Sequence, residues 1–118
     1  MLAGFAVKSC EMPHGPTFST AYRFEADGKI ICYATDFSEI TRDMVDLFSR
    51  TDILVVDCLR REAHPTHAHL AMALELAQAT RAGRTVLTHM DKSLDYATLS
   101  AEVPDHVLVG YDGLELEA

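Results

Sequence analysis

The chain has 118 residues and a mass of 13.0 kDa, and 48% of its residues are hydrophobic, which suits one modest core and predicts a single domain over residues 1–118. The chain contains ten Lys and Arg and eighteen Asp and Glu, which gives a formal net charge of −8. This charge repels phosphate backbones and anionic lipid surfaces, so we expect no nucleic-acid binding, and no apolar stretch approaches the roughly 20 residues of a membrane span.

The N-terminal segment predicts a strand followed by a loop. Residues 4–10 carry Phe5 and Val7 in an apolar setting, which favours a strand. Met12–Pro16 contains two prolines and a glycine, which are poor ladder residues, and it predicts the end of the strand. This interpretation places His14 on a loop.

A hairpin is predicted next. Residues 18–25 alternate between apolar and polar side chains, and Asp27-Gly28 supplies a tight turn. The return strand, Lys29–Thr35, is apolar on both faces, as in a covered central strand. It delivers Asp36 at its C-terminal end.

Two strand and helix pairs complete the middle of the chain. A helix behind a Ser38 or Thr41 cap has one apolar face and leads into the apolar strand Asp52–Cys58. The apolar face of that first helix is formed by Ile40, Met44, Val45 and Phe48. A second helix is predicted from a Thr66 cap to about Ala82, with Gly83 as its stop.

The last third predicts one more strand, Arg84–Thr88, which places His89 at its end. Asp91–Val103 is polar and predicts a loop with a short helix. Val107–Val109 and Leu114–Leu116 predict a closing hairpin around Asp112-Gly113. The alternation of strands and helices indicates an α/β fold with a mixed sheet and flanking helices.

The three cysteines, Cys10, Cys32 and Cys58, are odd in number and lack Cys-x-x-Cys spacing. Each lies in an apolar stretch, which predicts buried free thiols in a reducing compartment. The N-terminus has no basic region followed by a long apolar one, so we expect a cytoplasmic protein.

His14, Asp36 and His89 lie at the ends of predicted strands. α/β folds place their functional sites at the carboxyl ends of their strands. Imidazoles and carboxylates that converge from several strand ends are what a two-metal hydrolase needs. The alternatives are a solvated loop histidine for His14 and a helix cap for Asp36. The chain contains no His-x-His-x-Asp-His segment, so any such site is incomplete.

A second group of histidines lies at His64-Pro65-Thr66-His67-Ala68-His69. From the residues alone a polar first turn of a helix is the favoured interpretation, and a neutral His67 that assists at a bound phosphate is the alternative. Asp57 either orients a ligand or caps the following loop. His106 is expected to be exposed and inert.

Six segments, taken in order, resemble one family over nearly the whole chain. They are Met12–Gly15, Cys32–Asp36, Asp52–Asp57, His64–His67, Leu87–Asp91 and Gly110–Gly113. They are similar to the metallo-β-lactamase-fold hydrolases, in particular the branch related to phosphoribosyl cyclic phosphodiesterase. The resemblance spans only the C-terminal half of the family's length, and it implies half of an α/β/β/α sandwich.

The resemblance also implies roles for individual residues. His14 would complete the first metal site, Asp36 would bridge two divalent ions, zinc or manganese, and His89 would belong to the second site. His67 would be the active-site histidine beside the substrate phosphate, which reverses the order of preference given above, so the implied catalytic residues are Asp36 and His67. With two protein ligands for each ion, we expect weak or no metal retention by this chain alone.

The implied function is metal-dependent hydrolysis, with a phosphodiester in a small phosphorylated substrate as the expected target. The alternative is a non-catalytic interaction module that is stable only as an oligomer and keeps part of a ligand set. Half of the sandwich leaves one sheet face without a cover. We therefore expect a homodimer or higher assembly, or a partner that supplies the missing half.

Overall fold

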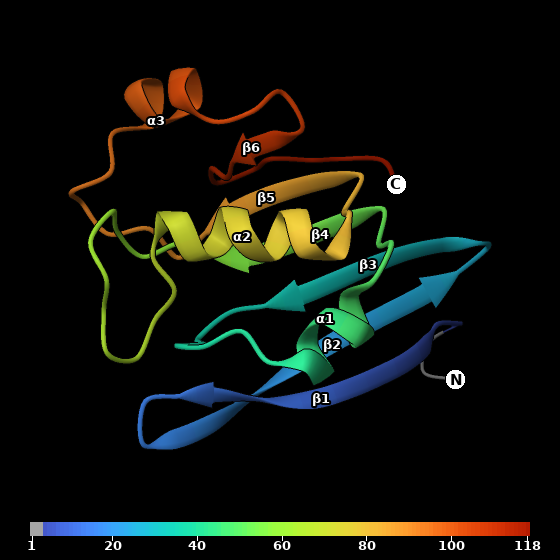
Figure 1. Ribbon diagram of the computed structural model, residues 1–118. Coiled ribbons are helices and arrows are strands. Elements are labelled where there is room, and N and C mark those ends of the chain that lie inside the picture. The colour runs from blue at the N-terminus through green and yellow to red at the C-terminus, as the bar shows by residue number, and fades with distance from the viewer. Residues whose placement is uncertain (1–3) are drawn as a thin grey trace.

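The computed structural model describes residues 4–118 and contains one six-stranded sheet in the order β1-β2-β3-β4-β5-β6 (Figure 1). Its strands are β1 (Ala6–His14), β2 (Thr17–Ala26), β3 (Lys29–Ala34), β4 (Ile53–Asp57), β5 (Arg84–Thr88) and β6 (Val107–Val109). β1, β2 and β3 pair antiparallel, and β3 to β6 pair parallel. The expected α/β fold with a mixed sheet is confirmed.

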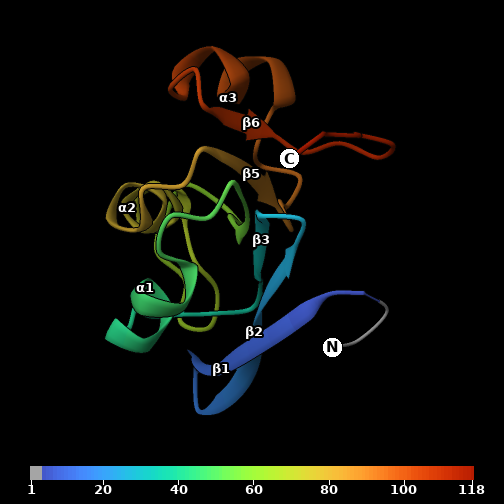
Figure 2. The ribbon, with the colours of Figure 1, turned by 90° about the vertical axis from the view of Figure 1, so that its right-hand side faces the viewer.

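Three helices accompany the sheet, and they are α1 (Arg42–Phe48), α2 (Leu70–Thr80) and α3 (Tyr96–Glu102). α1 and α2 cover one face, while α3 lies against β6 at the edge of the sheet (Figure 2). Between the helices and the sheet lies a core of fully buried side chains, among them Met44, Phe48, Leu54, Leu76 and Leu87. Within residues 4–118 no helix is long and apolar enough to cross a membrane.

The prediction that β1 ends before His14 was wrong. β1 runs through Pro13 to His14, which pairs with Thr17 of β2 across the turn at Gly15 and Pro16. A proline is compatible with this strand because β1 is at the edge of the sheet, where one side of the backbone needs no ladder bond. His14 is therefore held by a ladder rather than by a loop.

The second helix begins later than predicted. α2 starts at Leu70 with His69 at its N-cap position, and Thr66 caps nothing. The backbone groups just before α2 form other hydrogen bonds: Leu59 N–H donates to Ala68 O, and Leu70 N–H donates to Arg60 O. These long-range bonds hold residues 59–69 as a loop that folds back on itself, a constraint that helical periodicity does not reveal.

Three further terminus predictions have definite outcomes. The Thr41 hydroxyl, not Ser38, caps α1 by accepting from Met44 N–H. α2 stops at Arg81, which has a left-handed backbone with φ 55°, rather than at Gly83. The expected short helix in Asp91–Val103 is present as α3, and Asp95 caps it.

The closing hairpin does not form. The predicted turn is present, since Leu114 N–H donates to Tyr111 O around Gly113 with φ 90°, but within residues 4–118 no ladder follows it. Instead Leu114 lines one hollow with Val55 and Val86, on the face away from α1 and α2. The C-terminal segment therefore does not pair with β6 as a strand. It lies over the sheet, with Leu114 in this hollow.

The face of the sheet opposite α1 and α2 is mostly apolar; it is exposed at Tyr22 and Tyr33, whereas Ile53 and Val86 are buried. The strand register aligns two rows of side chains on it, Ser9-Tyr22-Tyr33-Val55-Val86-Leu108 and Val7-Phe24-Ile31-Ile53-Arg84. Tyr33 is 44% exposed and Tyr22 is 39% exposed. The three cysteines are free; Cys32 and Cys58 are buried as predicted, whereas Cys10 is only partly buried because it lies on the edge strand β1.

Candidate metal centre

The sheet brings the ends of four strands to one edge. β3, β4 and β5 are parallel neighbours, and β1 runs in the same direction because two antiparallel pairings separate it from β3. Asp36 follows β3, Asp57 is the last residue of β4, His89 follows β5 and His14 ends β1. The carboxyl edge of an open α/β sheet is where ligands usually bind.

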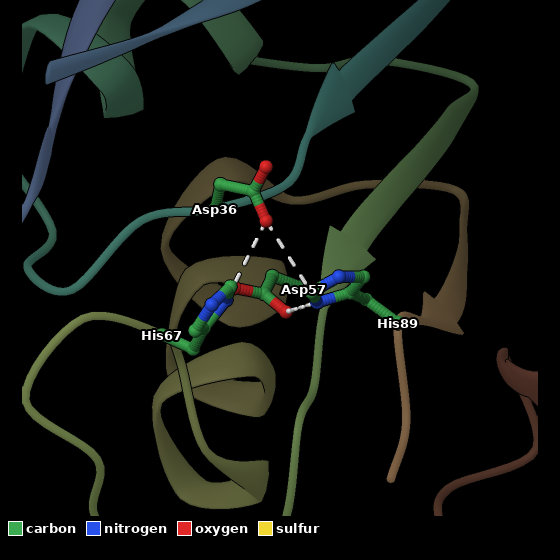
Figure 3. Close-up of side chains that lie close together, drawn as sticks. All are labelled: Asp36, Asp57, His67 and His89. Carbon is green, nitrogen blue, oxygen red and sulfur yellow. Dashed lines mark hydrogen bonds and ion pairs between the residues drawn. The ribbon is translucent and has the colours of Figure 1, made fainter.

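Two of these residues reach their positions through strained backbone. Asp36 has φ 63° and His89 has φ 62°, both in the left-handed region that side chains other than glycine enter rarely. Such conformations cluster at functional sites, where the surrounding structure holds them in place. Here they turn the chain sharply at the ends of β3 and β5 and direct both side chains to the same point (Figure 3).

Asp36, Asp57, His67 and His89 form a compact quartet whose potential ligand atoms all lie within 4.8 Å of one another (Figure 3). Nδ1 of His67 is 3.0 Å from Oδ2 of Asp57 and 3.5 Å from Oδ1 of Asp36. Nδ1 of His89 is 3.3 Å from Oδ1 of Asp57 and 3.8 Å from Oδ1 of Asp36. Two imidazole nitrogens and two carboxylates therefore face a common centre.

Asp57 is the buried base of the quartet. Its side chain is fully buried, and Oδ2 accepts hydrogen bonds from His67 Nδ1–H at 3.0 Å and from Ala68 N–H at 3.2 Å. Its other oxygen, Oδ1, is buried without a hydrogen-bond partner. Asp57 thus fixes the His67 loop and leaves one acceptor oxygen directed at the centre.

His14 stands beside this quartet, with its ring centroid 4.9 Å from that of His67. Its Nδ1–H donates to Thr66 O at 2.6 Å, which leaves Nε2 free. Metal-binding histidines typically donate their second ring nitrogen to a carbonyl or carboxylate in this way. On the other side of His67, burial and the positive charge of Arg60 lower the pKa of His64, which favours its neutral form.

The chemistry of the donors suits a divalent metal. Imidazole nitrogens and carboxylate oxygens are the ligands of catalytic zinc and of related two-metal centres. Within residues 4–118 no Lys or Arg forms an ion pair with either carboxylate of the quartet. Next to His89 lies a hollow of about 410 Å³ lined by Thr88, Met90 and Tyr111 among others, a size suited to a small molecule.

The structure gathers all four residues that the sequence singled out. Asp36, His67 and His89 are in the quartet and His14 is adjacent to it. Asp57 was recognised in the sequence without a decision between orienting a ligand and capping a loop, and in the structure its Oδ2 accepts from His67 Nδ1–H and from Ala68 N–H. The signal was an acidic residue at the end of the apolar run Ile53-Leu54-Val55-Val56. His106 is exposed, as expected.

The family model described as "Beta-lactamase superfamily domain" matches residues 3–90. No curated protein matches the chain. The matched region contains all the residues of the quartet.

Solved structures show the same fold. A diphosphatase from the PhnP family is 31% identical with a TM-score of 0.90, and the match covers 98% of this chain and 44% of that one. Human tRNase Z, short form, is 24% identical with a TM-score of 0.76, at 95% and 41% coverage. Zn(2+)-bound PqqB from Methylobacterium extorquens is 19% identical with a TM-score of 0.77, at 99% and 52% coverage. The chain therefore spans about half the length of these proteins.

Proposed function

The chain belongs to the beta-lactamase superfamily domain family and has the metallo-β-lactamase fold, and from this we propose that it is the C-terminal portion of a metal-dependent hydrolase that acts on a small phosphorylated substrate. The observation that carries the proposal is the convergence of Asp36, His67 and His89 at the carboxyl edge of the sheet. The similarity to a diphosphatase over 98% of the chain supports a phosphate ester or anhydride as the bond that is cleaved.

In the complete site we assign His14, Asp36 and His89 as metal ligands. The orientation of His14 supports this role, because its Nδ1 is used by Thr66 O and its Nε2 is free. Bound divalent ions, zinc or manganese, would lower the pKa of a water molecule and neutralise charge on the phosphate. The remaining ligands would come from a polypeptide segment with a His-x-His-x-Asp-His sequence, which this chain lacks.

We assign His67 to act on the substrate phosphate. Its Nδ1–H donates to Asp57, which holds the ring and leaves Nε2 as its second functional nitrogen. A side chain oriented in this way can transfer a proton to a leaving oxygen. The role of Asp57 in this arrangement is to position His67.

The test is a complementation assay. The chain is mixed with the N-terminal half of a related hydrolase, and hydrolysis of bis(p-nitrophenyl) phosphate is measured with zinc or manganese. We expect activity that Asp36→Ala and His67→Ala abolish and that His106→Ala, an exposed histidine outside the site, leaves unchanged. Activity that persists in the Asp36 and His67 variants would show that these roles are wrong.

A second candidate function rests on the open sheet face. The aligned apolar side chains, including the 44% exposed Tyr33, form a surface of the kind that proteins bury against a partner. On this alternative the chain is a non-catalytic module in which a second copy, or a chain that supplies the other half of the sandwich, covers this face.

Light scattering over a concentration series tests the assembly. We expect a dimer or higher assembly for the parent chain and a shift to monomer in Tyr33→Lys, because a charge at the centre of an apolar interface is strongly unfavourable. The matched control is Tyr96→Lys, which changes a 53% exposed tyrosine on α3. A monomeric parent chain at high concentration would argue against this assembly.

The free, buried Cys32 and Cys58 further favour a reducing compartment such as the cytoplasm.

A further inference from the structure

We propose that this chain by itself binds one divalent metal ion, preferably zinc, through Asp36, Asp57, His67 and His89. This site goes beyond the proposed function, in which His14, Asp36 and His89 hold two ions and His67 faces the substrate. It uses only residues of this chain, and it does not depend on hydrolase activity. Two of its ligands, Asp57 and His67, have no metal-binding role in the two-ion arrangement.

The separations between ligand atoms are close to those around one tetrahedral ion. Zinc binds nitrogen and oxygen ligands at about 2.0–2.2 Å, and a tetrahedron of that size places neighbouring ligand atoms about 3.4 Å apart. Nδ1 of His67 lies 3.0 Å from Oδ2 of Asp57 and Nδ1 of His89 lies 3.3 Å from Oδ1 of Asp57, and the two nitrogens lie 3.5 and 3.8 Å from Oδ1 of Asp36. One ligand atom from each of the four residues lies within 4.8 Å of the other three, so the four side chains would have to move closer together around the ion.

The buried carboxylate gives a second, independent reason for a cation here. Asp57 is fully buried, and its Oδ1 accepts no hydrogen bond, although Nδ1 of His89 lies 3.3 Å from it. A buried carboxylate oxygen without a partner is strongly unfavourable, and buried charges are normally paired or bound to metals. Among residues 4–118 the ionisable partners of Asp57 and Asp36 are the imidazoles of His67 and His89, with no Lys or Arg, so a divalent cation held between them would balance both carboxylates.

The ion would replace the proton that His67 shares with Asp57. In the metal-free chain Nδ1–H of His67 donates to Oδ2 of Asp57 at 3.0 Å. Moving this proton to Nε2 changes only the tautomer, and it frees the Nδ1 lone pair for the metal. Oδ2 still accepts from Ala68 N–H, so the loop that carries His67 stays attached.

This site revises the expectation of weak metal retention. That expectation counted two ligands for each of two ions, whereas the folded chain supplies four ligands for one ion, enough for a closed site. The two arrangements differ in their ligands: the single-ion site needs Asp57 and His67 and not His14, and the two-ion ligand set needs His14 and neither Asp57 nor His67. Substitution of these two histidines therefore separates them.

The experiment is equilibrium dialysis of the tag-free chain against buffered Zn²⁺, with the visible spectrum of the Co²⁺-loaded chain as a second readout. We expect one zinc per chain and a spectrum typical of four-coordinate cobalt. His67→Gln and His89→Gln should weaken zinc binding by more than about 100-fold, since loss of even an outer hydrogen-bond partner of a ligand costs 10- to 100-fold. Asp57→Asn, which keeps an acceptor for Ala68, should do the same.

Two matched variants should leave zinc affinity and the cobalt spectrum unchanged. In His14→Asn the side-chain amide N–H replaces Nδ1–H as the donor to Thr66 O, and Nε2 is lost. His106→Ala removes an exposed histidine. Circular dichroism of each metal-free variant separates loss of binding from loss of fold. The proposal is overturned if the folded parent chain binds no zinc, if binding survives His67→Gln, or if His14→Asn abolishes it.

Because hydrolysis is not measured, failure of this site leaves the proposed function standing. Conversely, one zinc bound through His67 in a chain that shows no activity in the complementation assay would support the single-ion site alone.

Discussion

Replacement of Asp57 by alanine tests whether this carboxylate holds the His67 loop on the sheet. The side chain accepts two hydrogen bonds, from His67 Nδ1–H and from Ala68 N–H, and the Ala68 bond is buried. Hydrogen bonds to a charged group contribute about 1.5–3 kcal/mol each. Removal of Oδ1, which accepts no hydrogen bond, also removes a desolvation cost of about 1–3 kcal/mol from the folded state. Subtracting this from the loss of the two hydrogen bonds, we expect the free energy of unfolding to fall by about 2–3 kcal/mol.

Urea unfolding of the metal-free chain, followed by circular dichroism, measures this loss. Asp57→Asn keeps one oxygen that can accept from Ala68 N–H without the charge, so its loss should be smaller, about 1 kcal/mol. Asp105→Ala is the matched control, because Asp105 is exposed and surface changes of this kind stay within about 0.5 kcal/mol.

With zinc present at about 100 times the dissociation constant, the parent chain should gain about 2.7 kcal/mol and Asp57→Ala should gain nothing. An Asp57→Ala chain as stable as the Asp105→Ala control in the absence of metal would refute the idea that Asp57 anchors the loop. Equal stabilisation by zinc in the parent and in Asp57→Ala would refute its role as a ligand.

Other residues give further predictions. Thr41→Ala removes the cap on Met44 N–H and should lower the free energy of unfolding by about 1 kcal/mol in urea. Gly110→Ala places a Cβ 2.7 Å from Leu87 O and should lower the free energy of unfolding by about 1–3 kcal/mol, and an unchanged urea midpoint would contradict the close approach. Burial raises the pKa of Cys58 from 9.0 to about 12, so iodoacetamide should label it only after unfolding. Because the unfolded thiol releases its proton first, stability should fall as pH rises above 9.0.

Most elements of the fold follow from local patterns in the sequence. The alternation of residues 18–25 and the apolar runs of β3, β4 and β5 specify strands because each needs one or two covered faces. The errors occurred where distant backbone groups decide the structure. β1 continues through Pro13 because it is an edge strand, and α2 starts after Thr66 because residues 59–69 bond to each other.

The candidate site was predictable to different degrees for different residues. Asp36 and His89 stand out because each follows a strand, and parallel strands bring such residues to one edge. His67 lies on a loop whose path depends on Asp57, so its placement came only from the resemblance to a family. Asp57 itself could be located in the sequence but not assigned, since its partners lie ten and eleven residues away.

The sequence by itself determined the donor types, their places at strand ends and the absence of a His-x-His-x-Asp-His segment. Only the tertiary structure decided which donors share a centre. Strand order and direction bring β3, β4 and β5 together, the left-handed backbone of Asp36 and His89 aims their side chains, and the folded-back loop adds His67. Distances of 3.0–3.8 Å between residues up to 53 positions apart are set by packing, which local sequence patterns do not encode.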